Sequence, residues 1–515
     1  MGAELILILL SVIGCLSTQA IKSRDLHHAP WAEDDCRRTL RESLAVSVNA
    51  RTPPKFNGKW TSSGCENRPG PEFVIRKYAF RKSGFTAQLF YYADEDCSHV
   101  THYVNARGTV RLVHESWRTP GGFEFRYQLT EVQIIPYTDT KAKEFGKLMR
   151  RYCSESSVNS VKTFRKFDIF KFPRKRNARE DGGATAEDFD CTKLFNFTMN
   201  EIQLIRVERR IEKSISGAVT RRELHLGDVS TDVTQRRQYV PTHYQAPLVK
   251  PWVQGCDVCR MISQASHRHP PVLPRRQHSA VALPGEWISQ RCETRPNGQF
   301  LTRHLSFLGW RSFQGMYEFF RDPLCKESSY SIAIKGTYAR TGASAAIPSA
   351  SEFVFKTTKL KITPNDYQML MFMNSYSGSK CGDAGSWKLG VTQDVTSTDG
   401  CVLLGITLPH VEHEIVKTEY DNSKSYLYTG QRPSDFVSMA ISKNRPTSFQ
   451  MPMIKCGGDN LIVEEVLPLF EQYSGNINSD SAVVEITGNS SAYRHHATSV
   501  LLFVALLSHC VLVGH

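Results

Sequence analysis

The fold is decided by a stretch that occurs twice, GKWTSSGCENRPGPEFVIRKYAF at residues 58–80 and GEWISQRCETRPNGQFLTRHLSF at residues 285–307. Nine residues are identical between the two copies at a constant offset of 227. In the first copy they are Gly58, Trp60, Cys65, Glu66, Arg68, Pro69, Phe73, Arg76 and Phe80. Because an internal repeat determines the architecture of a chain, this stretch predicts two copies of one domain.

The repeat extends beyond this stretch, with its register slipped by one residue. Cys97, Gly108, Phe125, Pro136 and Cys153 match Cys325, Gly336, Phe353, Pro364 and Cys381 at an offset of 228. Farther along, Cys191 corresponds to Cys401, and residues 241–247 match residues 446–452. Each copy therefore spans a little under about 200 residues, which is the size of an ordinary domain.

The strand pattern predicts the fold class. Phe123, Phe125, Tyr127 and Leu129 alternate with polar residues, as in a half-buried strand. Similar runs lie between turn residues at 73–80, 86–92, 103–113 and 201–207. Helices are expected at 34–48, at 141–151 and after Asn365. We therefore predict a mostly β chain with a few helices, forming two tandem lipocalin-like β-barrels that are stapled by disulfides.

The barrel prediction rests on a Gly-x-Trp motif that opens each copy, at Gly58–Trp60 and Gly285–Trp287, as it opens lipocalin barrels. A barrel of eight or nine strands can hold one small apolar ligand. Ten aromatic residues are candidates to line or close such a cavity, and ordinary core packing is the alternative for each. They are Trp60, Phe80, Phe90, Phe125, Tyr127, Trp287, Phe307, Tyr317, Phe353 and Phe355.

Both chain ends indicate secretion and membrane attachment. An apolar run at 5–16 precedes small residues and a cleavage position after Ala20, as in a signal peptide. A polar spacer and an apolar stretch at 500–513 nearly end the chain, which favours a glycosylphosphatidylinositol anchor over a spanning helix. The predicted organisation is a signal peptide at 1–20, a helical segment at 21–57, barrels at 58–256 and 285–456, a linker at 257–284, a stalk at 457–492 and the anchor region at 493–515.

Disulfides are expected in a secreted chain. Of 14 cysteines, Cys15 and Cys510 fall in the terminal segments, which leaves an even number. The candidates are Cys36, Cys65, Cys97, Cys153, Cys191, Cys256, Cys259, Cys292, Cys325, Cys381, Cys401 and Cys456. Symmetry suggests the pairs Cys65–Cys97, Cys292–Cys325, Cys153–Cys191 and Cys381–Cys401. If Cys256 matches Cys456, each copy holds an odd number, so Cys36, Cys259 or a bridge between domains must complete the pairing. We expect Cys36 to tie the N-terminal helix to the first barrel.

Surface features suggest partners. Sequons at Asn196 and Asn489 predict N-glycans. The net charge is +13, but secretion excludes nucleic acid, so basic clusters such as 174–176 could meet sulfated glycans or anionic lipid, or could simply be solvated. A homodimer is left open.

No catalytic or metal site is predicted. Cys256 and Cys259, with His267 and His269 beyond them, lack the second paired-ligand motif of a zinc site, which favours structural disulfides. No nucleophile elbow, phosphate loop or dinucleotide fingerprint is present. We therefore expect no enzyme activity, no cofactor and no metal.

Four longer motifs carry a family resemblance. They are GEWISQRCE at 285–293, LTRH at 301–304, GQRPSD at 430–435 and QLIRVE at 203–208. From Cys36 to Cys456, the chain resembles the adenomatosis polyposis coli down-regulated 1 family. The resemblance implies a membrane-anchored extracellular inhibitor of Wnt signalling that acts above β-catenin and engages Wnt proteins and low-density-lipoprotein-receptor-related co-receptors. It also implies two apposed barrels with an apolar cavity for the Wnt acyl chain. A lipid carrier or a matrix and glycan adhesion module is the alternative.

Overall fold

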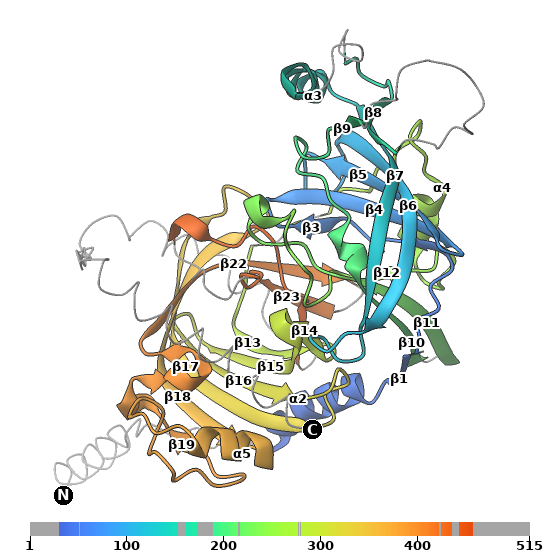
Figure 1. Ribbon diagram of the computed structural model, residues 1–515. Coiled ribbons are helices and arrows are strands. Elements are labelled where there is room, and N and C mark those ends of the chain that lie inside the picture. Colours follow the sequence, from blue (N-terminus) through green and yellow to red (C-terminus); the bar gives the residue numbers. More distant parts are fainter. Residues whose placement is uncertain are drawn as a thin grey trace, which may run out of the picture.

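The computed structural model describes residues 30–50, 52–152, 161–172, 189–214, 217–276, 278, 280–421, 424–434 and 442–456. These residues form two β-barrels that lie against each other (Figure 1). The strands of each barrel follow one another around the ring in chain order, and every neighbouring pair is antiparallel. The predicted fold class, two tandem β-barrels, is confirmed.

The first barrel closes through eight strands. They are β2 (Gly58–Thr61), β4 (Glu72–Arg81), β5 (Gly84–Tyr92), β6 (Val100–Glu115), β7 (Phe123–Pro136), β10 (Leu204–Ser214), β11 (Gly217–Leu226) and β12 (Leu248–Val249). The ring is completed where β12 pairs with β2 and where β7 pairs with β10.

The second barrel repeats this arrangement with eight strands. They are β13 (Gly285–Ser289), β15 (Gln299–Leu308), β16 (Ser312–Phe320), β17 (Ser328–Ala343), β18 (Ser351–Pro364), β22 (His410–Asp421), β23 (Lys424–Thr429) and β24 (Met453–Lys455). Strand β13 completes this ring by pairing with both β15 and β24.

Short strands and helices lie outside the two rings of barrel strands. The strands are β1 (Ser47–Ala50), β3 (Glu66–Arg68), β8 (Phe167–Lys171), β9 (Phe189–Asp190), β14 (Glu293–Arg295), β19 (Gln393–Asp394), β20 (Gly400–Cys401) and β21 (Ile406–Thr407). The α-helices are α2 (Pro30–Leu44), α3 (Asp139–Tyr152), α4 (Asp257–Gln264) and α5 (Tyr367–Asn374), and the 3₁₀ turn η2 covers Asn200–Gln203.

Helices α3 and α5 match the predictions after Pro136 and Asn365, but two boundaries were wrong. The N-terminal helix ends at Leu44, and Val48 lies in β1, where it pairs with Arg210 of β10. Likewise, Glu201 belongs to η2, and the strand begins only at Leu204. In the first case, pairing with a sheet edge outweighs the local helical pattern.

A buried ion pair explains why the repeat preserves its charged residues. In the first barrel, Glu66 pairs with Arg76 at 2.7 Å, and Arg76 Nη2 donates to the carbonyl of Ala246 at 2.8 Å. The second barrel repeats both contacts, between Glu293 and Arg303 at 2.9 Å and from Arg303 to Met451 O at 2.8 Å. The pair therefore joins the start of each repeat to the matching segment at its end.

The two tryptophans occupy equivalent core positions. Trp60 is 1 % exposed and its indole N–H donates to Phe56 O at 2.6 Å. Trp287 is 2 % exposed and donates to Leu283 O at 2.8 Å. In both barrels, a lysine near the last strand lies over the indole ring. A satisfied N–H allows an indole to be buried at low cost.

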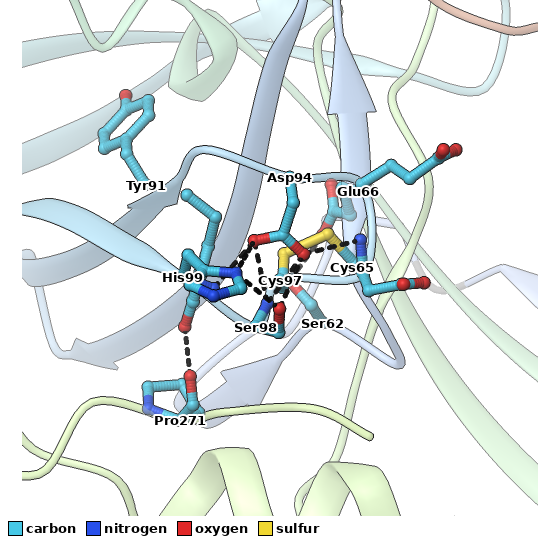
Figure 2. The surroundings of a disulfide bond; sticks show 12 residues. Ser62, Cys65, Glu66, Tyr91, Asp94, Cys97, Ser98, His99 and Pro271 are labelled. Atoms are coloured by element: carbon cyan, nitrogen blue, oxygen red, sulfur yellow. Dashed lines mark hydrogen bonds and ion pairs between the residues drawn. A yellow bond between two sulfur atoms is a disulfide. The ribbon is translucent and has the colours of Figure 1, made fainter. Parts of the chain in front are cut away.

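Five disulfides are described. Cys65–Cys97 and Cys292–Cys325 fasten equivalent corners of the two barrels, and Cys381–Cys401 fastens the second, as the symmetric assignment predicted. Figure 2 shows the first corner, where the Asp94 carboxylate accepts the backbone N–H groups of Ser98 and His99. Cys191 is also disulfide-bonded, and Cys153 lies outside the described residues.

The remaining cysteines correct one expectation. Cys36 bonds to Cys456, so it ties the N-terminal helix to the end of the second barrel and not to the first. Cys256 pairs locally with Cys259, although alignment of the repeats matched Cys256 with Cys456. The two aligned cysteines therefore have different partners, which the repeat alone could not reveal.

The connecting segment between the barrels packs firmly on the first one. Ile262 of α4 and Leu273 are buried in a cluster on the outer face of β4 and β5. The hydroxyl of Tyr92 donates to Pro271 O at 2.5 Å. Phe90 belongs to this outer cluster, so its predicted place inside the barrel was wrong.

Among the described residues, no helix combines the length and apolar character needed to cross a bilayer. The predicted signal peptide at 1–20, the basic cluster at 174–176, the stalk at 457–492 and the anchor region at 493–515 lie outside the described residues.

Candidate functional site

The first barrel has a narrow seam between β7 and β10. Only two residue pairs join these strands, Phe123 with Ile205 and Glu124 with Leu204. Farther along, β7 pairs with β8 from Glu131 onward. On this edge, residues 125–129 have no strand partner among the described residues. The strand pairing that closes the barrel is therefore interrupted over these residues.

A cavity of about 690 Å³ lies at this seam, which we call the seam pocket. Its apolar lining comes from the inward side of β7 and from the segments that face it. These residues are Phe125, Tyr127, Leu129, Phe170, Phe197 and Leu204. Charged and polar side chains, such as those of Glu124, Asp190 and Arg237, also line it. The seam pocket thus has a mixed lining, with an aromatic and aliphatic part beside a polar and charged part.

Two of the predicted aromatic residues belong to the seam pocket. Phe125 is buried in the barrel core, and Tyr127 is half-buried. The Tyr127 hydroxyl donates to Asn200 Oδ1 at 2.9 Å and accepts from Met199 N at 3.2 Å. Burial raises the pKa of Tyr127, so the phenol stays neutral and hydrogen-bonds the segment that covers the seam.

The other predicted residues of the first barrel lie deeper. Phe56 contacts Phe80 and Phe125 edge-to-face, with ring centroids 4.9 and 5.4 Å apart. Phe80 therefore supports the pocket wall from behind. Trp60 belongs to the same core cluster.

In the second barrel, the predicted aromatics pack on one another. Phe307 contacts Tyr338 at 5.3 Å, and Phe313 contacts Phe355 at 5.4 Å, both edge-to-face. Phe353 lies in the same cluster as these residues. The remaining members, Trp287 and Tyr317, are also part of this packing. These residues act as core, which was the alternative for each of them.

A second and larger space lies between the barrels, with a volume of about 1260 Å³, and we call it the inter-barrel cleft. Its floor is the outer face of β10 and β11. Cross-strand neighbours on this face are Arg206 with His225, Glu208 with Glu223, and Arg210 with Arg221. The inward residues of the same strands, such as Ile205 and Val207, are apolar core.

The central acids of the cleft are buried and paired. Arg206 Nε donates to Glu208 at 2.7 Å, and Arg291 of the second barrel donates to Glu223 at 2.7 and 3.3 Å. His225 Nε2 lies 3.4 and 3.5 Å from the two carboxylates. Burial opposes ionisation of both acids, but these cations hold their pKa values well below the ordinary range. The carboxylates raise the pKa of His225 in spite of its burial.

The same three side chains could hold a metal ion. The ligand atoms of Glu208, Glu223 and His225 all lie within 4.8 Å of one another. However, Arg206 and Arg291 already occupy the carboxylate oxygens. A dication would have to displace or sit beside these guanidinium groups, so the arrangement is better suited to an ion-pair network.

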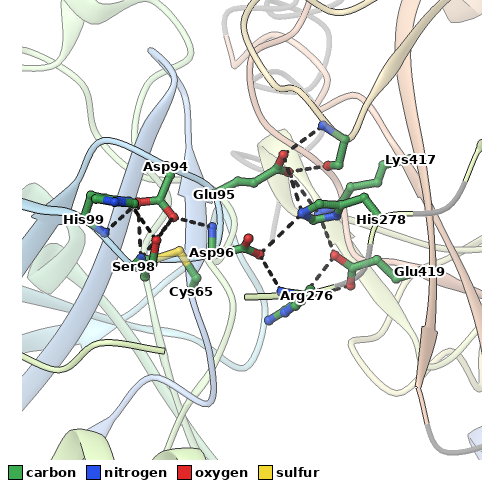
Figure 3. A network of polar contacts seen from close by, with 12 residues as sticks. Cys65, Asp94, Glu95, Asp96, Ser98, His99, Arg276, His278, Lys417 and Glu419 are labelled. Atoms are coloured by element: carbon green, nitrogen blue, oxygen red, sulfur yellow. Dashed lines mark hydrogen bonds and ion pairs between the residues drawn. A yellow bond between two sulfur atoms is a disulfide. The ribbon is translucent and has the colours of Figure 1, made fainter. Parts of the chain in front are cut away.

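Another polar network joins the barrels at the edge of the cleft (Figure 3). Glu95, in the corner after β5, accepts the backbone N–H of Ser349 at 2.8 Å. His278 lies 3.5 Å from Asp96, and Arg276 donates to Glu419 of β22 at 3.1 Å. The connecting segment therefore places basic side chains beside acids of both barrels.

Removal of the Arg291 guanidinium is expected to destabilise the protein. Arg291→Gln leaves buried Glu223 without its cross-barrel partner, which should cost about 2 kcal/mol at pH 7. The depressed pKa of Glu223 contributes stability that is complete above its ordinary value of 4.5 and is lost as the pH falls through the folded value. The difference between wild type and variant should therefore shrink below about pH 4.5.

Thermal unfolding measured between pH 3 and pH 7 checks this expectation. Arg276→Gln is the matched control, because its ion pair with Glu419 is 46 % exposed on the arginine side and should contribute less than about 1 kcal/mol. Equal effects of the two variants, or a difference that does not depend on pH, would contradict the assignment.

The inter-barrel cleft was not predicted from the sequence. A signal was present, because apolar residues alternate with charged ones in Ile205–Glu208, which indicates a strand whose outer face is charged. Such a face is ordinarily solvated. Only the placement of the second barrel reveals that Glu223, at 1 % exposure, is buried.

Of the two predicted N-glycosylation sites, the structure describes only Asn196. The Asn196 side-chain amide donates to Val233 O at 2.6 Å, and a glycosylated amide would keep one N–H group for such a bond. Asn489 lies outside the described residues. N-glycosylation of both remains a prediction.

A family model described as adenomatosis polyposis coli down-regulated 1 matches residues 35–274 and 276–460. The chain belongs to this family. The two matched segments divide the chain within the connecting segment, so each contains one barrel. Membership of the adenomatosis polyposis coli down-regulated 1 family relates the chain to the Wnt pathway. The disulfides, in turn, indicate a secretory or extracellular protein.

Proposed function

We propose that this protein is a negative regulator of Wnt signalling at the cell surface, acting above β-catenin. In this proposal, it binds Wnt proteins through their acyl chain and engages the low-density-lipoprotein-receptor-related co-receptor. Family membership supports the pathway, and the seam pocket of the first barrel supports the mode of binding. No catalytic role is proposed.

The seam pocket is the observation on which the proposal rests. Ligand pockets in proteins measure about 300–1,000 Å³, and this one measures about 690 Å³. Aromatic and aliphatic side chains form one part of its lining, polar and charged side chains form the rest, and it lies at the gap between β7 and β10. A chain bound there could lie along the apolar part of the lining, while its polar attachment point stays at the polar part.

The energy of burial is large enough for such a role. Each buried methylene contributes about 0.8 kcal/mol, so about ten methylenes would contribute about 8 kcal/mol before the costs of ordering. An acyl chain held in this way could not occupy the lipid groove of a receptor. Sequestration of the chain would then be sufficient for inhibition.

The proposed location is the outer face of the plasma membrane. The predicted signal peptide and the apolar C-terminal stretch at 500–513 support it, with a glycosylphosphatidylinositol anchor preferred over a spanning helix. Release by a phosphatidylinositol-specific phospholipase would support the anchor, and retention would favour the helix. Sulfated glycans and a homodimer stay predictions.

The direct test compares acylated Wnt with Wnt that lacks its acyl chain, each binding to the purified protein. We expect the acylated form to bind at least about a hundredfold more tightly, since a few buried methylenes are worth this much. Equal binding of the two forms would exclude acyl capture. A Wnt-dependent reporter assay then separates the inhibitor from the alternative: lipid binding with no loss of transcription would favour an extracellular lipid carrier.

A further inference from the structure

The connecting segment carries a disulfide at the start of helix α4. Cys256 is the N-cap residue of this helix, and it is bonded to Cys259, only three positions further along the chain. The Cys256 sulfur also accepts the backbone N–H of Cys259 at 3.1 Å. The sequence favours a purely structural bond for this pair, but its position at a helix start gives the two sulfur atoms a different chemistry.

This bond contributes less to holding the fold together than the other described disulfides. Those bonds join residues between 20 and 420 positions apart. In the chain-entropy model, a disulfide stabilises a protein more when it closes a longer loop. A bond across three positions therefore has the smallest structural role of the five.

Helix α4 is held on the first barrel by other contacts. Ile262 is buried in the cluster on the outer face of β4 and β5. Lys77 Nζ donates to the carbonyl oxygens of Ser263 and Ala265, at 3.1 and 2.5 Å, and so satisfies the end of the helix. Reduction of the Cys256–Cys259 bond should therefore leave α4 in place.

The two cysteines differ in their exposure. Cys256 is half-buried, whereas Cys259 is fully buried, at 0 % exposure. Thiol–disulfide exchange requires direct attack of a thiolate on one sulfur of the bond, so access decides which sulfur is attacked. An external thiol can reach Cys256 far more readily than Cys259. Cys259 is then the leaving thiol, and its burial next to Cys256 keeps it ready to re-form the bond.

The helix start favours the reduced form of the pair. Backbone N–H groups and the helix dipole stabilise a thiolate at a helix N-terminus. The N–H of Cys259 already donates to the Cys256 sulfur, so it would stabilise the thiolate that reduction produces there. A disulfide whose reduced form is stabilised accepts electrons more readily from another pair of thiols.

We propose that Cys256–Cys259 is a redox-active disulfide that oxidises an accessible pair of cysteine thiols on another secreted protein. One partner thiolate attacks Cys256, the Cys256–Cys259 bond breaks, and Cys259 leaves as a thiolate that takes up a proton. The second partner thiolate then attacks the partner sulfur of the mixed disulfide and expels the Cys256 thiolate, which is protonated in turn. The partner loses two electrons and two protons and gains a disulfide, while Cys256 and Cys259 become thiols.

Equilibration of the purified full chain with glutathione redox buffers tests the proposal. Acid quenching and alkylation trap the free thiols, and peptide mass spectrometry locates them. Cys65–Cys97 is the matched control, because it also joins a half-buried cysteine to one at 0 % exposure but does not lie at a helix start. We expect the equilibrium constant for reduction of Cys256–Cys259 to be at least about a hundredfold larger than that of the control.

Two single variants separate the roles of the cysteines. Cys259→Ser leaves Cys256 unpaired, so it should form a stable mixed disulfide with oxidised glutathione. Cys256→Ser leaves the buried Cys259 unpaired, and this thiol should react at least about tenfold more slowly. A synthetic peptide with two reduced cysteines is the dithiol probe, and one equivalent of the wild-type protein should oxidise it while the Cys259→Ser protein should not.

Three results would overturn the proposal. They are reduction of Cys256–Cys259 no more favourable than that of Cys65–Cys97, equal reactivity of the two single variants, and loss of the folded circular dichroism spectrum when only the Cys256–Cys259 bond is reduced. If a variant does not fold, the glutathione equilibrium of the wild-type protein decides alone. Neither cysteine lines the seam pocket, so binding of acylated Wnt should be the same before and after reduction of this bond.

Discussion

Leu129→Arg is expected to reduce binding of acylated Wnt by at least about a hundredfold. Leu129 is half-buried, lines the seam pocket and packs against the core of the first barrel. Arginine at this position places a charge in the path of the acyl chain, and burial of an unpaired charge is strongly unfavourable. The barrel should still fold, because the substituted side chain lies at the open seam and can reach water. Surface plasmon resonance with acylated Wnt measures the loss, and a reporter assay should record the return of Wnt-driven transcription.

Gln128→Arg is the matched control. Gln128 is the neighbouring residue on β7, but it is exposed and points to the opposite face of the strand. The Gln128→Arg substitution adds the same charge one residue away from Leu129, but the new side chain does not enter the pocket. We expect binding of acylated Wnt to stay within about twofold of wild type, since exposed substitutions have small effects. Retained binding in Leu129→Arg, or an equal loss in Gln128→Arg, would exclude the seam pocket as the acyl site.

Arg303→Met should strongly destabilise the second barrel. Arg303 is 3 % exposed and donates to Glu293, to Thr429 Oγ1 and to the carbonyl of Met451. Methionine leaves Glu293 buried without this partner, which costs about 3–5 kcal/mol. Urea denaturation of the purified protein with its disulfides intact measures the change.

The control is Arg311→Met, in the turn before β16, where the side chain is exposed. Its expected effect is within about 0.5 kcal/mol of wild type. If both variants lost the same stability, the buried pair would have no special structural role. The equivalent pair, Glu66 with Arg76, would then need another explanation for its recurrence.

Much of the fold could be predicted from the sequence because the repeat preserves what holds each barrel together. The tryptophan, the Glu–Arg pair and the corner disulfide recur at fixed offsets, and each proved to make the same contact twice. Alternation along Phe123–Leu129 correctly identified a strand with an aromatic inner face. These features are local or are duplicated, so pattern alone reveals them.

Features that depend on contacts between the two barrels, or on the connecting segment, could not be predicted from the sequence. In β5, both Leu89 and Phe90 are buried, one in the barrel and one under the connecting segment, so alternation does not identify the inner face. The partner of Cys36 is 420 residues away and lies in the other barrel. The inter-barrel cleft forms only where the two barrels pack against each other. In the sequence, its charged floor cannot be distinguished from an ordinary solvated strand face.

The Cys36–Cys456 disulfide has a mechanical consequence. It closes a covalent ring that contains both barrels, since the two cysteines stand near the first and last described residues. A pull on the chain beyond residue 456 would be passed across the sulfur bridge to α2 as well as to β24. The load would be shared between the two ends of the ring, and β24 would not peel from its neighbours one hydrogen bond at a time. Tension applied at the end of the second barrel would therefore not separate β24 from the rest of its sheet.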